Sequence, residues 1–84
     1  MNINIKATNT TLTPSIKQDI EKKLTALSKF LKPEHKLYVE VEVLKKHKSG
    51  LTQRVEVNIK PSNMYAEAVG ADFYEALDLV VPKI

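Results

Sequence analysis

The chain has 84 residues and no cysteine, which allows a single domain and excludes disulfide bonds, thiolate nucleophiles and cysteine metal sites. Its hydrophobic share of 43% is enough for one core and argues against disorder, while the formal net charge of +3 favours an anionic partner. The sequence has no apolar run suited to a signal peptide or to a membrane span of roughly 20 residues, so we expect a cytoplasmic protein.

The first third of the chain predicts a strand followed by a helix. Residues 2–8 alternate apolar and polar side chains, as a half-buried strand does. Thr13 and Pro14 then indicate a helix start, because the hydroxyl caps free amide groups and proline needs no donor there. Pro33 disfavours helical geometry in the preceding residue, so we expect the helix to end near Lys32. Its apolar face is predicted from helical spacing to comprise Ile16, Ile20, Leu24, Leu27, Phe30 and Leu31.

The middle of the chain has the pattern of a β-hairpin. Residues 37–43 and 54–60 place leucine, valine and isoleucine at every second position, with polar or charged residues between them. This period of two is typical of strands with one face in water. The mostly polar residues 44–53 include Gly50 and are predicted to form the connecting loop. A hairpin alone is marginally stable, so the other elements must cover its apolar side.

A fourth strand and a second helix complete the pattern. Residues 64–69 alternate again, and the small alanines among them would let a helix approach the sheet closely. Gly70 is predicted to allow the chain to turn. Asp72 and Glu75 form a variant of the capping box, which indicates a helix start. Pro82 ends or kinks this helix, since its ring clashes with the preceding turn.

The order of these elements predicts an α+β fold for a single domain over residues 1–84. We expect two layers: a four-stranded mixed sheet, with both helices on its apolar face. The first two strands are joined by a helix and could therefore lie parallel, while the last three would form an antiparallel meander.

The pattern of reactive side chains does not predict an enzyme. His35 and His47 lie in lysine-rich loops, and neither has an obvious carboxylate partner or the spacing of a metal site. The two glycines stand alone, so no phosphate-cradling loop is present. Glu40 and Glu42 are predicted on the wet sheet face, where nothing raises a carboxylate pKa. We therefore expect no catalytic residues, no metal and no cofactor. An acid–base enzyme would need a pocket that holds a histidine near a carboxylate.

Lysines gather in the first helix region and near the hairpin tip. Such groups dominate nucleic-acid binding by neutralising phosphates, and a folded RNA can be recognised by its shape. The basic loop has no aromatic residue, which argues against sequence-specific readout of single strands. A solvated lysine-rich surface is an equally open interpretation. The candidate RNA-binding residues from this pattern are Lys22, Lys29, Lys32, Lys45, Lys46 and Lys48.

A second class of function is a protein-interaction module. It would use the exposed acidic and aromatic face of the sheet, centred on Tyr38, Glu40 and Tyr65. Salt dependence separates the two classes, because binding to RNA phosphates weakens steeply as salt rises.

Five parts of the chain carry a family pattern, in this order: NINIKATN, Thr13-Pro14, KLTALSKFL, LYVEVEV and AEAVGADFYEALDLVV. They resemble the short ribosome hibernation promoting factors, which include the ribosome-associated translation inhibitors once called sigma modulation proteins. The resemblance covers essentially the whole chain. It implies a β-α-β-β-β-α domain similar in layout to double-stranded-RNA-binding domains. It also implies a bacterial protein that binds ribosomal RNA of the small ribosomal subunit near the decoding region and inhibits translation by steric occlusion, without a small-molecule substrate.

The resemblance also suggests site residues. Basic residues on both helices face ribosomal RNA in the family, which points to Lys22, Lys23 and Lys29 here. Family members usually continue the second helix through a run rich in lysine and arginine. Here Pro82 interrupts it and Lys83 is the only basic residue that follows, so we expect half of that basic surface to be missing. The 84 residues also do not include the long-form carboxy-terminal domain that pairs ribosomes. The resemblance leaves the oligomeric state open.

Overall fold

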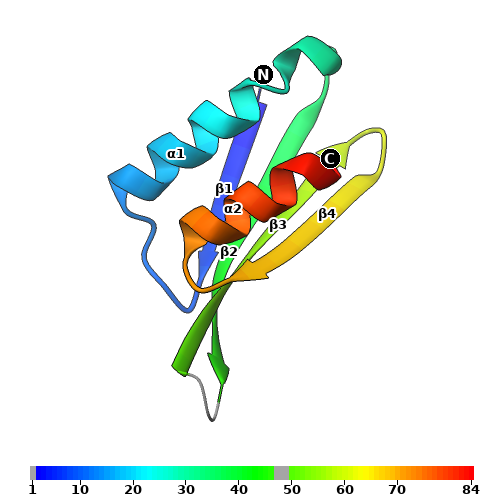
Figure 1. Cartoon of the computed structure of the whole chain (residues 1–84). Coiled ribbons are helices and arrows are strands. Elements are labelled where there is room, and N and C mark those ends of the chain that lie inside the picture. Colours follow the sequence, from blue (N-terminus) through cyan, green and yellow to red (C-terminus); the bar gives the residue numbers. More distant parts are fainter. Residues whose placement is uncertain (1, 47–49) are drawn as a thin grey trace.

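The computed structural model describes residues 2–46 and 50–84 and confirms the predicted α+β class. One four-stranded sheet has the order β1-β2-β3-β4, with β1 parallel to β2 and the other neighbours antiparallel, as predicted. Both helices lie on one face of the sheet (Figure 1). The elements are β1 (Asn2–Thr8), α1 (Pro14–Thr25), the 3-10 turn η1 (Ser28–Phe30), β2 (Lys36–Lys46), β3 (Gly50–Lys60), β4 (Met64–Gly70), α2 (Phe73–Val80) and the 3-10 turn η2 (Val81–Lys83).

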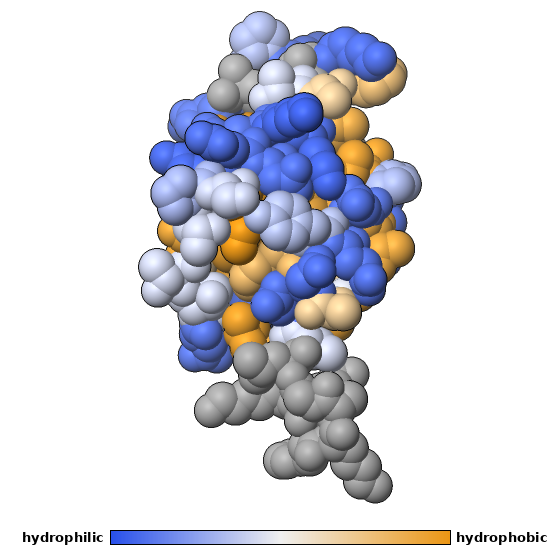
Figure 2. All heavy atoms as spheres, turned by 60° about the vertical axis from the view of Figure 1, so that its left-hand side comes forward, coloured by the Kyte–Doolittle hydropathy of each residue, from blue (hydrophilic) through white to orange (hydrophobic). Residues whose placement is uncertain are grey.

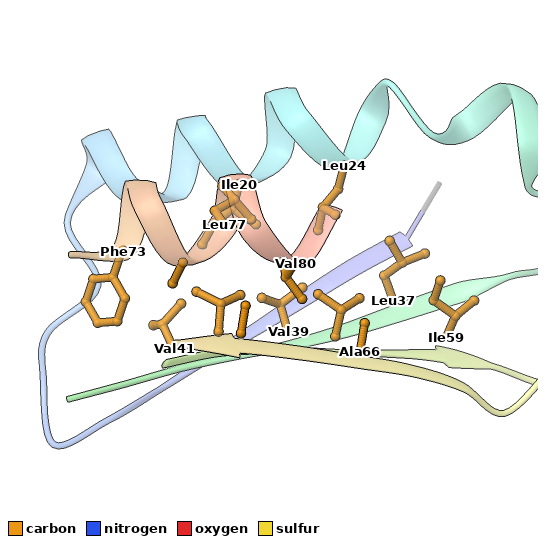
Figure 3. Close-up of a cluster of buried hydrophobic side chains, with 14 residues drawn as sticks. Ile20, Leu24, Leu37, Val39, Val41, Ile59, Ala66, Phe73, Leu77 and Val80 are labelled. Carbon is orange, nitrogen blue, oxygen red and sulfur yellow. The ribbon is translucent and has the colours of Figure 1, made fainter. Parts of the chain in front are cut away.

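The core is a layer of apolar side chains between the helices and the sheet (Figure 3). The alternating residues of β2 and β3 meet in register, with Val39 opposite Val57 and Val41 opposite Val55. These four valines are at most 2% exposed, so the period-two pattern correctly marks the buried face. Ile20 and Leu24 are the buried residues of α1. Within the described residues, no helix is long and apolar enough to cross a membrane.

Small residues of β4 let α2 lie close to the sheet. Ala66 and Ala68 are both buried, as the sequence suggests, and Figure 3 shows Ala66 on the side of the sheet that faces the helices. Gly70 ends the strand and is buried as well. A Cβ atom at this position would lie 2.8 Å from the amide nitrogen of Ala76, closer than real Cβ contacts come. Gly70 is therefore required by the close approach of the α2 backbone, and not by a turn at its own position.

Asp72 caps α2 in the predicted way. Its carboxylate accepts a hydrogen bond from the Glu75 amide at 2.8 Å, and the Glu75 carboxylate accepts one from the Ala71 amide at 3.2 Å. We expect Asp72→Ala to lower the free energy of unfolding by about 1 kcal/mol in urea titrations, because an amide loses its acceptor. Asp72→Asn keeps an acceptor and is the matched control. Equal losses in both variants would assign the effect to the charge and contradict this account.

The first helix ends earlier than predicted. The prediction of a helix to near Lys32 is wrong beyond Thr25, because hydrogen bonds from Leu27 to Leu24 and from Phe30 to Leu27, each 2.9 Å, tighten the chain into three-residue turns. Leu27 stays packed against the core. The change of period turns Phe30 outward, and this side chain is 74% exposed. The assignment of Phe30 to the apolar helix face is therefore also wrong.

The hairpin is longer than predicted. Residues 44–53 were expected to form a loop, yet β2 and β3 pair as far as Lys46 and Gly50. The pairing with β1 ends at Glu42, and that with β4 ends at Gln53. Beyond these points the two strands have each other as neighbours, and they extend past the rest of the sheet (Figure 1). We call this part, residues 43–46 and 50–52, the hairpin arm.

Candidate nucleic-acid interface

Three of the predicted lysines are exposed along α1 and the segment that follows it. Lys22 lies in the last turn of α1, Lys29 in η1, and Lys32 two residues after η1. The ion pairs found within residues 2–46 and 50–84 do not include these three lysines. The view that brings α1 forward is dominated by hydrophilic residues (Figure 2). We call Lys22, Lys29 and Lys32 the basic edge; its ammonium groups are available to an external anion.

Lys23 has internal partners. Its ammonium group forms an ion pair with Asp78 of α2 and lies 3.4 Å from the carboxylate of Asp19 on its own helix. The hydrogen bond to Asp78 raises the pKa of Lys23, with a further contribution from Asp19. This side chain therefore links the two helices. The tertiary contact is invisible to sequence spacing, since Asp78 is 55 residues away along the chain.

The lysines of the hairpin lie elsewhere. Lys45 and Lys46 are the last residues of β2, opposite Leu51 and Gly50, and Lys48 lies outside the described residues. Figure 1 shows the hairpin arm at one end of the molecule and η1 at the other. The molecule measures 42 Å along its longest axis. The two predicted groups of lysines are therefore not brought together, and an RNA that touched both would have to span most of this length.

The exposed charged side chains on α2 are acidic, in contrast to the basic edge at the end of α1. Asp72, Glu75 and Asp78 are exposed on or beside α2, and Lys83 follows in η2. The Lys83 ammonium group donates to the backbone carbonyl of Glu67 at 3.0 Å, so it covers the outer edge of β4. An acidic helix repels phosphate, so α2 is not a candidate for phosphate contacts.

Arg54 organises the wet face of the sheet. Its guanidinium donates to the carboxylate of Glu67 at 2.6 Å and to that of Glu42 at 3.4 Å. It also pairs with Glu56 and lies 3.6 Å from Glu40. The arginine side chain is 16% exposed, so these charges interact in a partly desolvated setting. One cation thus holds four carboxylates that otherwise repel one another across the strands.

Tyr65 extends this network and shifts its titration. The hydrogen bond from the Tyr65 hydroxyl to Glu67, 2.9 Å long, lowers the pKa of Glu67, and Arg54 adds to the effect. The same bond raises the pKa of Tyr65. Burial lowers the pKa of Arg54, but hydrogen bonds to Glu56 and Glu67 more than offset it and raise the pKa overall. The guanidinium therefore keeps its charge. The polar groups of the sheet face, which the protein-interaction module would use, are largely paired with one another.

Of the two histidines, His35 lies within the described residues, and its side chain makes a structural contact. His35 accepts a hydrogen bond from the backbone amide of Lys32 at 2.9 Å and closes the turn after η1. His47, the second histidine of the chain, lies outside the described residues. Among residues 2–46 and 50–84, no three histidine or carboxylate side chains converge in a way that could hold a metal ion.

Sequence reasoning missed one candidate binding residue, Phe30. Its ring is exposed at the end of η1, and the ammonium group of Lys29 lies 5.2 Å from the ring centroid. A cation beside an exposed aromatic ring is a cation–π arrangement, which places a positive charge and a flat apolar surface together. The alternating tyrosines and glutamates predicted an exposed sheet face, while the helical spacing predicted that Phe30 lies in the core.

The geometry defines a small two-layer α+β domain with a basic edge that runs from the end of α1 past η1, and with an internally paired acidic sheet face. The chain belongs to the sigma 54 modulation protein / S30EA ribosomal protein family, whose pattern matches residues 3–84. This match confirms the family that the sequence resemblance suggested.

Similar proteins are known from sequence and from structure. The chain is 30% identical over 86 residues to the ribosome hibernation promotion factor of Bacillus subtilis strain 168; the match covers 100% of this chain and 44% of that protein, so the chain spans less than half of its relative's length. A ribosomal subunit interface protein from Coxiella burnetii has a TM-score of 0.80 at 25% identity, covering 99% of this chain and 88% of the other. The N-terminal domain of Protein Y from Thermus thermophilus has a TM-score of 0.73 at 25% identity, covering 99% and 90%.

Proposed function

We propose that this chain is a ribosome-binding domain over residues 1–84 that acts in the cytoplasm. It binds ribosomal RNA of the small subunit near the decoding region and inhibits translation, or promotes hibernation, by steric occlusion. Membership of the family and the names of the relatives support a role at the ribosome. The observation that carries the phosphate contact is the basic edge, whose three lysines are exposed and outside the ion pairs of the described chain.

The seven predicted lysines have different parts in this proposal. Lys22, Lys29 and Lys32 make the principal phosphate contacts, because their charges are available. Lys23 orients α1 against α2 through Asp78 and so fixes the position of the basic edge. The remaining candidates, Lys45, Lys46 and Lys48, belong to the hairpin and would contact a separate part of the RNA. No reaction is involved, because blocking a channel requires a rigid body and a complementary surface.

The basic edge can be tested by charge reversal. Lys22→Glu combined with Lys29→Glu is expected to abolish co-sedimentation with purified small ribosomal subunits, since two phosphate contacts become repulsive. Wild-type binding should weaken steeply with salt, and single Lys→Ala changes should each reduce the salt slope by about one. Circular dichroism should show an unchanged fold, because both side chains are exposed.

Lys36→Glu with Lys60→Glu is the matched control. These two lysines are exposed, lie opposite each other on β2 and β3, and give the same change in net charge. The control should still pellet with small subunits. If both double variants lose binding equally, net charge and not the basic edge governs association. If the Lys22 and Lys29 variant still pellets, or if affinity is insensitive to salt, the sheet face of Tyr38, Glu40 and Tyr65 becomes the better candidate.

A further inference from the structure

An apolar hollow of about 520 Å³ lies at the end of the molecule that carries η1 and the carboxyl terminus. Two of its residues are well exposed: Phe30 at 74% and Met64 at 40%. An apolar hollow beside an exposed aromatic ring is a candidate ligand site. The hollow is lined by Phe30 together with Leu27, Leu31, Met64, Val81, Pro82 and Ile84.

Lysines flank Phe30 at this hollow. Lys29 places its ammonium group 5.2 Å from the centroid of the Phe30 ring, and the exposed Lys32 follows two residues later. No side chain among the described residues that line the hollow carries a carboxylate. Both lysines also belong to the basic edge. A flat aromatic surface is thus continuous with the proposed phosphate contacts, which favours an occupant that is itself flat, apolar and attached to a phosphate.

We propose that Phe30 and this hollow take one unpaired nucleobase of the RNA that contacts the basic edge. The base stacks on the Phe30 ring, and Lys29 and Lys32 hold the flanking phosphates. Unstacked bases in RNA loops are commonly bound by aromatic side chains, and this binding tolerates any base because every base has a π-face. A volume of about 520 Å³ also lies within the usual range of small-molecule sites. The inference rests on the proposed function, because it concerns the same RNA partner.

The nature of the contact can be tested with Phe30→Leu and Phe30→Trp. Leucine keeps the apolar character without a π-face, whereas tryptophan keeps the π-face. We expect Phe30→Trp to bind purified small subunits like the wild type, and Phe30→Leu to bind roughly ten-fold more weakly. Leu79→Ala, at a 47% exposed position of α2 outside the hollow, should leave the affinity unchanged. Full affinity of Phe30→Leu would overturn base stacking.

Fluorescence gives an independent readout. The chain contains no tryptophan, so Phe30→Trp carries a single reporter. Stacking should quench its emission when a single-stranded oligouridylate of about ten nucleotides is added, and an abasic oligomer of the same length should not. Equal responses to both oligomers would overturn the proposal. If the emission of Phe30→Trp shifts to the blue on ribosomes and Phe30→Leu binds them with full affinity, the occupant of the hollow is instead an apolar protein segment.

The two proposals can fail separately. If the wild type does not pellet with small subunits, the proposed function fails, and the comparison of base-containing with abasic oligomers still decides whether Phe30 stacks. If the wild type pellets and Phe30→Leu pellets equally well, ribosome binding stands and base stacking is refuted.

Discussion

Replacement of Leu24 by alanine is expected to lower the free energy of unfolding by about 3 kcal/mol. The Leu24 side chain is fully buried and, with Ile20, it attaches α1 to the core (Figure 3). Loss of its methyl groups leaves a cavity between the helix and the sheet. Domains of this length typically have a free energy of unfolding of about 4–12 kcal/mol, so the loss is a large share of the total. Urea unfolding followed by circular dichroism measures it.

Phe30→Ala is the contrast to this prediction. The change removes a larger apolar side chain, yet Phe30 is 74% exposed, so we expect a loss below about 1 kcal/mol. A loss comparable to that of Leu24→Ala would mean that Phe30 packs against the core in solution, and it would contradict both the early end of α1 and the stacking proposal.

Replacement of Arg54 by methionine is expected to lower the free energy of unfolding by about 2 kcal/mol at pH 7. Methionine fills similar volume but removes the cation from four carboxylates on neighbouring strands. Breaking a buried ion pair from one side costs about 3–5 kcal/mol, and partial exposure of the glutamates reduces this figure. Lys60→Met, at an exposed position of the same sheet, should change the free energy of unfolding by less than about 0.5 kcal/mol.

The effect of Arg54→Met should depend on pH. Tyr65 and Arg54 lower the pKa of Glu67 in the folded state, so the stabilisation from this carboxylate is present above its ordinary pKa of 4.5 and is lost as the pH falls through the lowered value. In the variant the glutamates repel one another, and protonation relieves that repulsion. The difference between wild type and variant should therefore shrink from pH 7 toward about pH 3. A difference independent of pH would assign the loss to packing.

The strands and the helix starts could be predicted because their signals are local. Alternation marks one buried face of each strand, and β1 begins and ends at the predicted residues. Thr13 and Asp72 carry side chains that accept amide hydrogen bonds at the helix starts, so capping chemistry is readable from residue type. Pro82 ends α2 at Val80 for an equally local reason.

The end of α1 and the hairpin arm could not be predicted. Over one turn, a spacing of three residues fits both an α-helix and a 3-10 helix, so the pattern of Leu27 and Phe30 did not reveal the change at Thr25. No helix covers the hairpin arm (Figure 1), so alternation of apolar and polar residues is not required there. Residues 44–53 therefore have the pattern of a loop. The same limit applies to the candidate site: the partner of Lys23 comes from a distant helix, and the exposure of Phe30 follows from a change of helical period.

The distribution of charge within the helix layer affects how the molecule would approach a large polyanion. Lysines 22, 29 and 32 lie in α1 or in the segment after it, whereas Asp72, Glu75 and Asp78 lie on or beside α2. Such a separation contributes to the electric dipole moment of the protein a component directed from α2 toward the basic edge. In the field of a polyanion the dipole experiences a torque that turns the basic side forward before any contact forms. Mutual orientation would then begin during diffusion, and low salt would favour encounters that are already correctly aligned.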